Sequence, residues 1–279
     1  MSGIHIAAFI TFALSLVVYG GALGWNSPRQ ERAFLATALT LQIPMSLLTY
    51  YAVRLPLDGW LKEILQPNAA FPWIKLLYAP LTEEPAKLWP LLVPWFTRKI
   101  TCENAVRVAV ALGLGFGLGE IFLVARLVAG DPKIARLPWH QLGGFINERF
   151  LVCLMHGVFT ATALCAWRRG RGGFALGLMG AMTLHLLGNL PIFLAQLDAF
   201  GSNKAVTNLF LDLWVPAYWL AMLTLLAFYS TGGWKVGRFI FGDATCPACG
   251  QIYARPLLAL NLGAKRLERC PSCKKWHKL

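Results

Sequence analysis

The sequence predicts an all-α polytopic membrane protein with about seven transmembrane helices and a small C-terminal zinc ribbon. The chain of 279 residues is 57% hydrophobic and only 14% charged, whereas soluble domains have about 25% charged residues. Its mean hydropathy is +0.54. Apolar residues gather in long stretches, and two closely spaced cysteine pairs occur near the C-terminal end.

Several apolar stretches approach the roughly 20 residues that cross a bilayer as a helix. We predict spans at Ile4–Leu23, Ala33–Val53, Phe71–Phe96, Ala105–Val128, Phe150–Trp167, Phe174–Leu197 and Leu209–Tyr229. No basic segment precedes the first stretch and no small-residue cleavage site follows it, so we interpret it as a span rather than a signal peptide. Between the second and third spans, Leu55–Leu65 mixes apolar and charged positions, as is typical of a short interfacial helix.

The net charge of +13 has two readings, nucleic-acid binding or a loop bias combined with a basic tail. We favour the second. The Arg168-Arg169-Gly170-Arg171 loop and the start of the tail carry many of the basic residues. By the positive-inside rule, this predicts a cytoplasmic C-terminus and an external N-terminus. We therefore expect an integral protein of a bacterial-type cytoplasmic membrane, with the lipid bilayer rather than nucleic acid as its partner.

The composition changes after Tyr229, which predicts a transmembrane domain over residues 1–229, a linker over 230–244 and a cytoplasmic zinc ribbon over 245–279. The ribbon is indicated by two C-x2-C motifs formed by Cys246, Cys249, Cys270 and Cys273. Four thiolates at this spacing are typical of a structural zinc site. Two disulfides are the alternative, which a cytosolic location disfavours. His277 is a spare donor, and the ribbon's partner could be protein, lipid headgroups or nucleic acid.

The third predicted span contains charged residues near its middle, at Glu83, Glu84 and Lys87. Such residues cost at least ~2.5 kcal/mol each on insertion scales, so they normally face a protein interior and have a function. Glu83 and Lys87 are four residues apart and can form an ion pair on one helical face. Pro85 lies between them and predicts a kink beside the glutamates.

The following three spans each carry further polar residues near the same depth. Glu120 lies in the fourth span, His156 in the fifth, and His185 with Asn189 in the sixth. The spacing of Arg149 and His156 places them on one face. We expect these residues to converge on one buried polar cavity.

Two further patterns concern packing. The fourth span has small residues four apart, Gly113 with Gly117 and Gly115 with Gly119. This pattern lets neighbouring helices approach closely, and we interpret it as close packing. Gln42 in the second span is expected to hydrogen-bond a neighbouring helix.

Carboxylates and histidines in a wet, buried cavity can activate water, with a Glu as general base and a His or amide group stabilising the oxyanion. Alternatively, Glu83, His156 and His185 could supply three ligands to a catalytic zinc. A non-catalytic scaffold or a proton-coupled transporter could use the same buried polar residues. Transporters often contain inverted repeats, and this sequence has no visible internal repeat.

The ordered motifs are Glu83-Glu84-x-x-Lys87, Gly115-Phe116-x-x-x-Glu120, His156 and His185-x-x-x-Asn189. Together they resemble the PrsW-type intramembrane proteases, which belong to the superfamily of the CAAX-prenyl proteases. The resemblance covers about residues 75–195 and leaves out the ribbon.

The resemblance implies that Glu83 is the base that activates water and that Glu84 and Lys87 order the motif. It places Glu120 where the prenyl-protease relatives have a His, so His156 takes over part of that function. His185 and Asn189 would stabilise the oxyanion. We therefore expect an intramembrane endopeptidase that hydrolyses a peptide bond of a membrane-associated protein. We favour a metal-free glutamic mechanism and keep a catalytic zinc as the alternative.

Overall fold

The computed structural model describes residues 2–25, 27–65, 70–101, 103–167, 171–199, 204–231, 243–255, 260–262 and 265–278. The chain divides into a helical unit, Met1–Met222, and a second unit, Leu223–Leu279. The second unit begins within the last long helix and contains the short strands and the cysteines that lie between them. Most of the predicted linker, residues 232–242, lies outside the described residues.

The helical unit begins with two long, nearly continuous helical segments, each interrupted by one π-helical turn. The first consists of α1 (Gly3–Ser15), η1 (Leu16–Gly20) and α2 (Gly21–Trp25). The second consists of α3 (Arg29–Thr49), η2 (Tyr50–Arg54) and α4 (Leu55–Leu65). π-helical turns inside α-helices are rare, and those that do occur are often found at functional sites.

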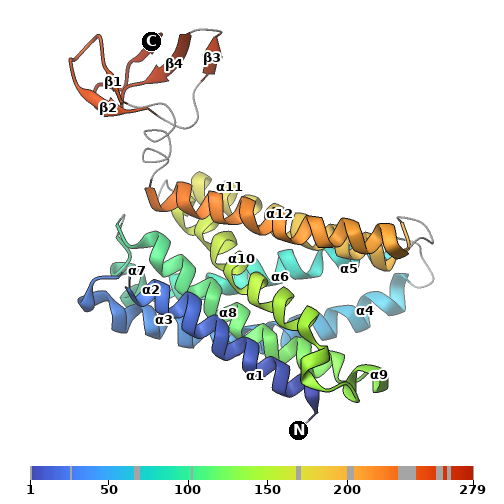
Figure 1. Cartoon of the computed structure of the whole chain (residues 1–279). Helices are drawn as coiled ribbons and strands as arrows, with labels where there is room; N and C mark the ends of the chain where they lie inside the picture. Colours follow the sequence, from blue (N-terminus) through green and yellow to red (C-terminus); the bar gives the residue numbers. More distant parts are fainter. Residues whose placement is uncertain are drawn as a thin grey trace. The chain divides into compact units, whose positions relative to one another are not determined.

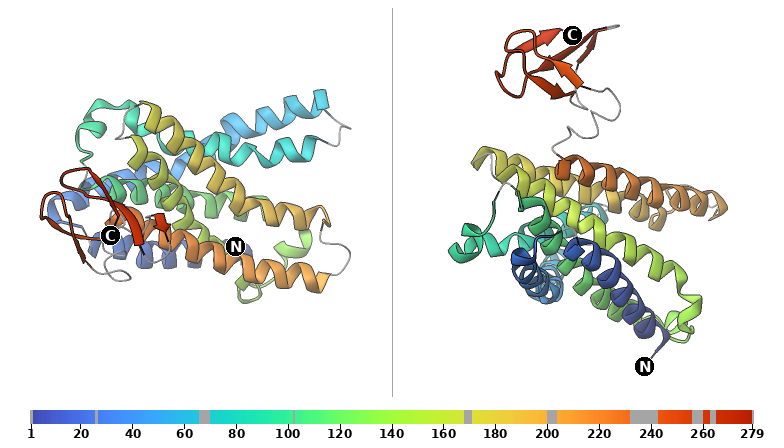
Figure 2. Two further views of the ribbon diagram at one scale, coloured as in Figure 1. Left: turned by 90° about the horizontal axis from the view of Figure 1, so that it is seen from above. Right: turned by 60° about the vertical axis from the view of Figure 1, so that its left-hand side comes forward.

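Three long helices and two short ones follow residues 71–98, a segment made of several short helices that is described below. They are α8 (Ala105–Val128), α9 (Pro132–Ala135), η4 (Trp139–Gln141), α10 (Gly143–Trp167) and α11 (Arg171–Gln196). The last helix, α12 (Lys204–Thr231), lies beside α11 in two views (Figure 1, Figure 2). Tyr218 of α12 donates a hydrogen bond to the Leu184 carbonyl of α11.

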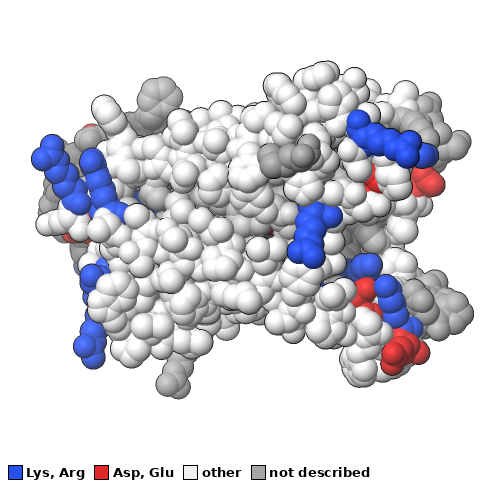
Figure 3. Space-filling model, turned by 90° about the horizontal axis from the view of Figure 1, so that it is seen from below, with Lys and Arg blue, Asp and Glu red and all other residues white. Residues whose placement is uncertain are grey.

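Six helices among the described residues are long and apolar enough to span a membrane, so the polytopic helical class is supported. They are Gly3–Trp25, Arg29–Leu65, Ala105–Val128, Gly143–Trp167, Gly172–Gln196 and Thr207–Ser230. Many large apolar side chains are exposed on the surface. In Figure 3, a broad face with few charges separates charged groups that lie toward the two ends. Such an apolar band suits the hydrocarbon core of a bilayer.

The predicted span over Phe71–Phe96 is wrong as a single helix. The structure has α5 (Phe71–Leu76), α6 (Tyr78–Lys87), the 3₁₀ turn η3 (Trp89–Leu92) and α7 (Pro94–Arg98) instead. Proline explains the breaks, because it lacks an N–H donor and disfavours helical geometry in the residue before it. α6 ends at Lys87, three residues before Pro90, and Pro94 starts α7. Pro85, in contrast, lies inside α6.

Helix α8 is the centre of the helical unit and packs against both α3 and α10. Of the residues in its most apolar stretch, 78% are buried, against 11% in the most apolar stretch of α12. A side chain added at Gly113 or Gly117 would collide with the α10 backbone, and one at Gly115 or Gly119 with the α3 backbone. The close packing predicted from these glycines is therefore confirmed, with one pair facing each neighbour.

The second unit contains two small antiparallel sheets. In one, β1 (Asp243–Thr245) pairs with β2 (Ile252–Ala254), with Ala244 opposite Tyr253. In the other, β4 (Lys265–Arg269) pairs with both β3 (Leu260–Leu262) and β5 (Trp276–Lys278).

Replacing Gly113 by Ala should destabilise the helical unit, because the new methyl group would overlap the carbonyl of His156 in α10. Overpacking of this kind costs about 1–3 kcal/mol. Gly21→Ala is the matched control, since no atom lies within 4 Å of its added carbon. Thermal unfolding in detergent should show a lower midpoint for Gly113→Ala only. Equal midpoints for the two variants would contradict the packing argument.

Candidate active site and candidate metal centre

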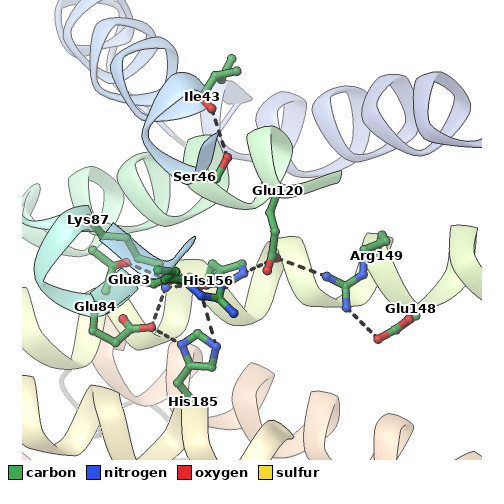
Figure 4. A network of polar contacts seen from close by, with 12 residues as sticks. Ile43, Ser46, Glu83, Glu84, Lys87, Glu120, Glu148, Arg149, His156 and His185 are labelled. Carbon is green, nitrogen blue, oxygen red and sulfur yellow. Dashed lines mark hydrogen bonds and ion pairs between the residues drawn. The ribbon is translucent and has the colours of Figure 1, made fainter. Parts of the chain in front are cut away.

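The structure brings buried polar and charged residues of four separate helices into one hydrogen-bonded network (Figure 4). Glu83, Glu84 and Lys87 come from α6, Glu120 from α8, and His156 from α10. His185 reaches the same network from α11, and its neighbour Asn189, one turn further on, lines the adjoining cavity. All seven residues predicted from the sequence therefore lie in or beside one network.

Lys87 is the most deeply enclosed charge in the network, and its side chain is 0% exposed. Its Nζ atom donates to Glu84 Oε1 at 2.6 Å and to His156 Nδ1 at 2.7 Å. The rings of Phe116 and Phe159 lie 5.0 and 5.6 Å from the ammonium group. The faces of aromatic rings attract cations. Both an anion and two aromatic rings therefore compensate for its removal from water.

The expected ion pair between Glu83 and Lys87 does not form, because Lys87 pairs with Glu84 instead. Glu83 contacts Arg54, whose guanidinium lies 2.6 Å from Glu83 Oε1. Arg54 ends the π-helical turn η2 that follows α3. Nothing in the sequence predicts this contact, since Arg54 has the position of an ordinary charge beyond the end of an apolar stretch.

The second carboxylate oxygen of Glu83 is buried and has no hydrogen-bond partner among the described residues. It lies 3.9 Å from Nε2 of His185. Nδ1 of His185 is 2.6 Å from Glu84 Oε1. Because a carboxylate can only accept, Nδ1 carries a proton. In the neutral tautomer of the ring, Nε2 has a free lone pair, so that two hydrogen-bond acceptors face the same space.

His156 connects Lys87 to the third carboxylate. Because an ammonium group can only donate, Nδ1 of His156 accepts and Nε2 carries the proton. Nε2 lies 2.9 Å from Glu120 Oε2. Arg149 also contacts this oxygen, at 3.3 Å, and binds Glu148 at 2.7 Å. Arg149 and His156 share a face as expected, and Glu120 is the group on which they meet.

A cavity of about 240 Å³ adjoins this network. It is large enough for several water molecules, each of which needs only about 10–15 Å³ of such volume. Charged and polar walls come from Arg54, Glu83, Glu120, Arg149, His185 and Asn189 among others, and apolar walls from residues such as Ile192 and Trp214. The site therefore combines reactive polar groups with space for water and an apolar ligand segment.

The end of α6 is fixed by α3. Gln42 Nε2 donates to the Lys87 carbonyl at 2.8 Å. This carbonyl belongs to the last turn of α6, where backbone acceptors lack partners within the helix. The predicted contact of Gln42 with a neighbouring helix is confirmed, and it fixes the segment that carries Lys87.

Glu83, His156 and His185 can each direct one ligand atom to a common point, and these atoms lie within 4.8 Å of one another. However, both ring nitrogens of His156 already have partners, Lys87 and Glu120. A metal ion at His156 would have to displace an ammonium group or a carboxylate. The donor set thus fits a three-ligand metal centre only after rearrangement.

The four cysteines of the second unit form a different candidate metal centre. Cys246, Cys249, Cys270 and Cys273 place their sulfur atoms within 4.8 Å of one another. Sγ distances are 3.6 Å for Cys246–Cys273 and 3.8 Å for Cys249–Cys270. Tetrahedral zinc with bonds of about 2.3 Å requires sulfur separations of ~3.8 Å. The cluster therefore matches the size of such a site. His277 lies beside it, with Nε2 3.1 Å from Cys246 Sγ.

The thiols of this cluster have unequal acidities. Burial raises the pKa of Cys270, but hydrogen bonds from the backbone N–H groups of Cys273 and Ser272 stabilise the thiolate and lower the pKa to about 6. A backbone hydrogen bond from Gln251 lowers the pKa of Cys249, but contacts with the other thiols outweigh it and raise the pKa to about 11. A bound divalent cation would let all four ionise together.

Comparisons with known proteins identify no relative: no family model, curated protein or solved structure matches the chain.

Replacing Lys87 by Met should destabilise the helical unit, because it leaves the buried Glu84 carboxylate without its cation. Removing one partner of a buried ion pair costs about 3–5 kcal/mol. The double variant Glu84→Gln/Lys87→Met should recover part of this loss. Thermal unfolding of both variants tests the expectation, and a single variant as stable as the wild type would contradict it.

We expect the purified protein to contain one divalent metal ion per chain, held by the four cysteines. Cys249→Ser should lose it, whereas Cys165→Ser in α10 should retain it. Acidification should release the metal, because protons compete with the cation for the thiolates. Elemental analysis measures the metal content. A Cys249→Ser variant that keeps its full metal content would contradict this assignment.

Proposed function

We propose that the protein is an intramembrane endopeptidase that uses Glu83 to activate water and cleaves a peptide bond of a membrane-associated protein. One observation carries the proposal. Glu83 is buried beside a cavity and held at one oxygen by Arg54, and its second oxygen, which has no hydrogen-bond partner among the described residues, faces His185. The ordered motifs that resemble those of the PrsW-type proteases support the same function.

A water molecule between Glu83 Oε2 and His185 Nε2 could donate one hydrogen bond to each acceptor. Glu83 would take a proton as the hydroxide attacks the carbonyl carbon of the substrate. His185 would then receive that proton at Nε2, stabilise the oxyanion and pass the proton to the leaving amine. The Asn189 amide group, on the same cavity wall, would supply a second donor to the oxyanion.

The other charged residues would keep these groups in place. Arg54 binds the oxygen of Glu83 that does not take part. Glu84 fixes the tautomer of His185, and Lys87 fixes Glu84. Glu120 and Arg149 orient His156 from the other side. Catalysis requires this arrangement because small errors in the position of reacting groups greatly slow the reaction.

We favour a metal-free mechanism over a catalytic zinc. The partners of both His156 nitrogens support this choice, since coordination would break one of those bonds. If Glu83, His156 and His185 did hold zinc, the metal would polarise a water or carbonyl oxygen. We assign zinc to the four cysteines instead, where it would be structural, because a site with four sulfur ligands has no open position for substrate.

We also propose that the C-terminus is cytoplasmic. Among the described residues, two candidate spans, Gly172–Gln196 and Thr207–Ser230, separate the basic segment Arg168–Arg171 from the tail. The two basic segments therefore share a side whether or not the broken segment Phe71–Phe96 crosses the bilayer. Because cytoplasmic loops carry excess Lys and Arg, the positive-inside rule assigns that side to the cytoplasm.

Glu83→Gln should abolish peptide cleavage, because the amide cannot accept the proton from water. We expect a loss of at least about 10²-fold, as for removal of a general base. The matched control Glu63→Gln neutralises an exposed carboxylate of α4 and should leave the rate unchanged. The assay is cleavage of a panel of transmembrane peptides by purified protein in detergent.

A chelator separates the two mechanisms when the assay includes a Cys246→Ser/Cys249→Ser variant, which lacks the ribbon site. Cleavage by this variant that survives chelation supports the metal-free mechanism, and cleavage that stops on chelation supports a metal in the core. A Glu83→Gln protein as active as the wild type would refute the proposed role of Glu83. If no peptide is cleaved by the wild type, the scaffold and the proton-coupled transporter become the better interpretations.

A further inference from the structure

Two segments of the second unit have the same backbone hydrogen-bonding pattern around their cysteines. We call Thr245–Ala254 the first knuckle and Arg269–Lys278 the second knuckle. In the first, the N–H of Gly250 binds the carbonyl of Cys246 at 2.9 Å, and in the second the N–H of Lys274 binds the carbonyl of Cys270 at 3.0 Å. The N–H of each of these cysteines binds the carbonyl five residues later, at 2.9 Å in both. Each position in one knuckle therefore has a structural equivalent in the other.

The equivalent positions Gly250 and Lys274 both have positive φ angles, 69° and 61°. Glycine adopts this conformation without penalty, but a side chain makes it unfavourable. The second knuckle therefore places a lysine where the local backbone favours glycine. Such locally unfavourable residues suggest a functional reason for the side chain.

The two knuckles differ strongly in charge. The first has no charged residue, whereas the second has four basic residues and no acidic one. The four, Arg269, Lys274, Lys275 and Lys278, are all exposed. The acidic residue just before the second knuckle, Glu268, is 1% exposed. The surface of the second knuckle is thus uniformly basic.

The second knuckle also exposes a large aromatic side chain. Trp276 is 62% exposed and lies opposite Arg269 in the sheet formed by β4 and β5. The equivalent residue of the first knuckle, Ile252, is 63% exposed but has no basic neighbours within its knuckle. Tryptophan beside lysine and arginine is typical of residues at the level of lipid headgroups.

We propose that the second knuckle binds the anionic headgroups of the membrane in which the protein resides, with Trp276 inserted at headgroup level. The covalent structure favours this partner. α12 ends at Thr231 and β1 begins at Asp243, so a short connection ties the knuckles to a candidate membrane span. Surfaces that bind single-stranded nucleic acid stack successive bases on several aromatic rings, whereas the second knuckle has one.

The test compares amide hydrogen exchange of the full-length, metal-loaded protein in two kinds of lipid nanodisc. One contains only phosphatidylcholine, and the other contains phosphatidylglycerol in addition. Each basic residue near an anionic surface strengthens binding about fivefold. We expect exchange in the second knuckle to slow at least fivefold in the anionic nanodiscs, and this protection to weaken at high salt. Exchange in the first knuckle should not change.

The triple variant Lys274→Gln/Lys275→Gln/Lys278→Gln should lose the lipid-dependent protection, and Trp276→Ser should reduce it. Lys133→Gln, which removes an exposed charge from the helical unit, is the control and should behave like the wild type. Metal content measured for each variant shows that the cysteine cluster is intact. Equal exchange in the two nanodiscs would refute the proposal. Protection by added DNA or by an acidic peptide in neutral nanodiscs, without protection by anionic lipid, would also refute it.

Discussion

The burial of the Lys87 ammonium group is the constraint on which the helical unit depends. An unpaired charge in a medium of low dielectric constant is very costly, so the chain must supply compensating groups from several helices. Glu84, His156 and the two phenylalanine rings do so from α6, α8 and α10. Gln42 adds a contact from α3 to the backbone of the same residue. The four helices that meet at Lys87 thus also position Glu83 on α6 and Glu84, which binds His185 of α11.

The glycines of α8 make this convergence possible. They allow the backbones of α3 and α10 to come close to α8 on two faces, so His156 reaches a buried position beside Glu120. Larger side chains at these positions of α8 would hold α10 further from α8 and separate His156 from Glu120. Polar chemistry and close packing are therefore linked through the same stretch of sequence.

The sequence predicts which residues meet in the helical unit better than it predicts their individual contacts. Polar residues are energetically costly inside a membrane, so those at similar depth in successive spans are expected to face a common cavity. The grouping of Glu83, Glu120, His156 and His185 could therefore be predicted. The choice of Glu84 over Glu83 as partner of Lys87 depends on side-chain geometry within the short helix α6, and local spacing permits both. The role of Arg54 could not be read from the sequence, because nothing local distinguishes it from other basic residues near the end of an apolar stretch.

The broken segment between α4 and α8 has a consequence for biogenesis. Its charges and prolines make it a poor substrate for insertion into the bilayer on its own, by the same energetic scale that applies to isolated membrane helices. Its polar side chains gain partners inside the membrane only when helices that are synthesised later supply Glu120, His156 and His185. We therefore expect α6 to settle last during assembly at the translocon, so that a partly synthesised chain would not yet contain a complete polar centre.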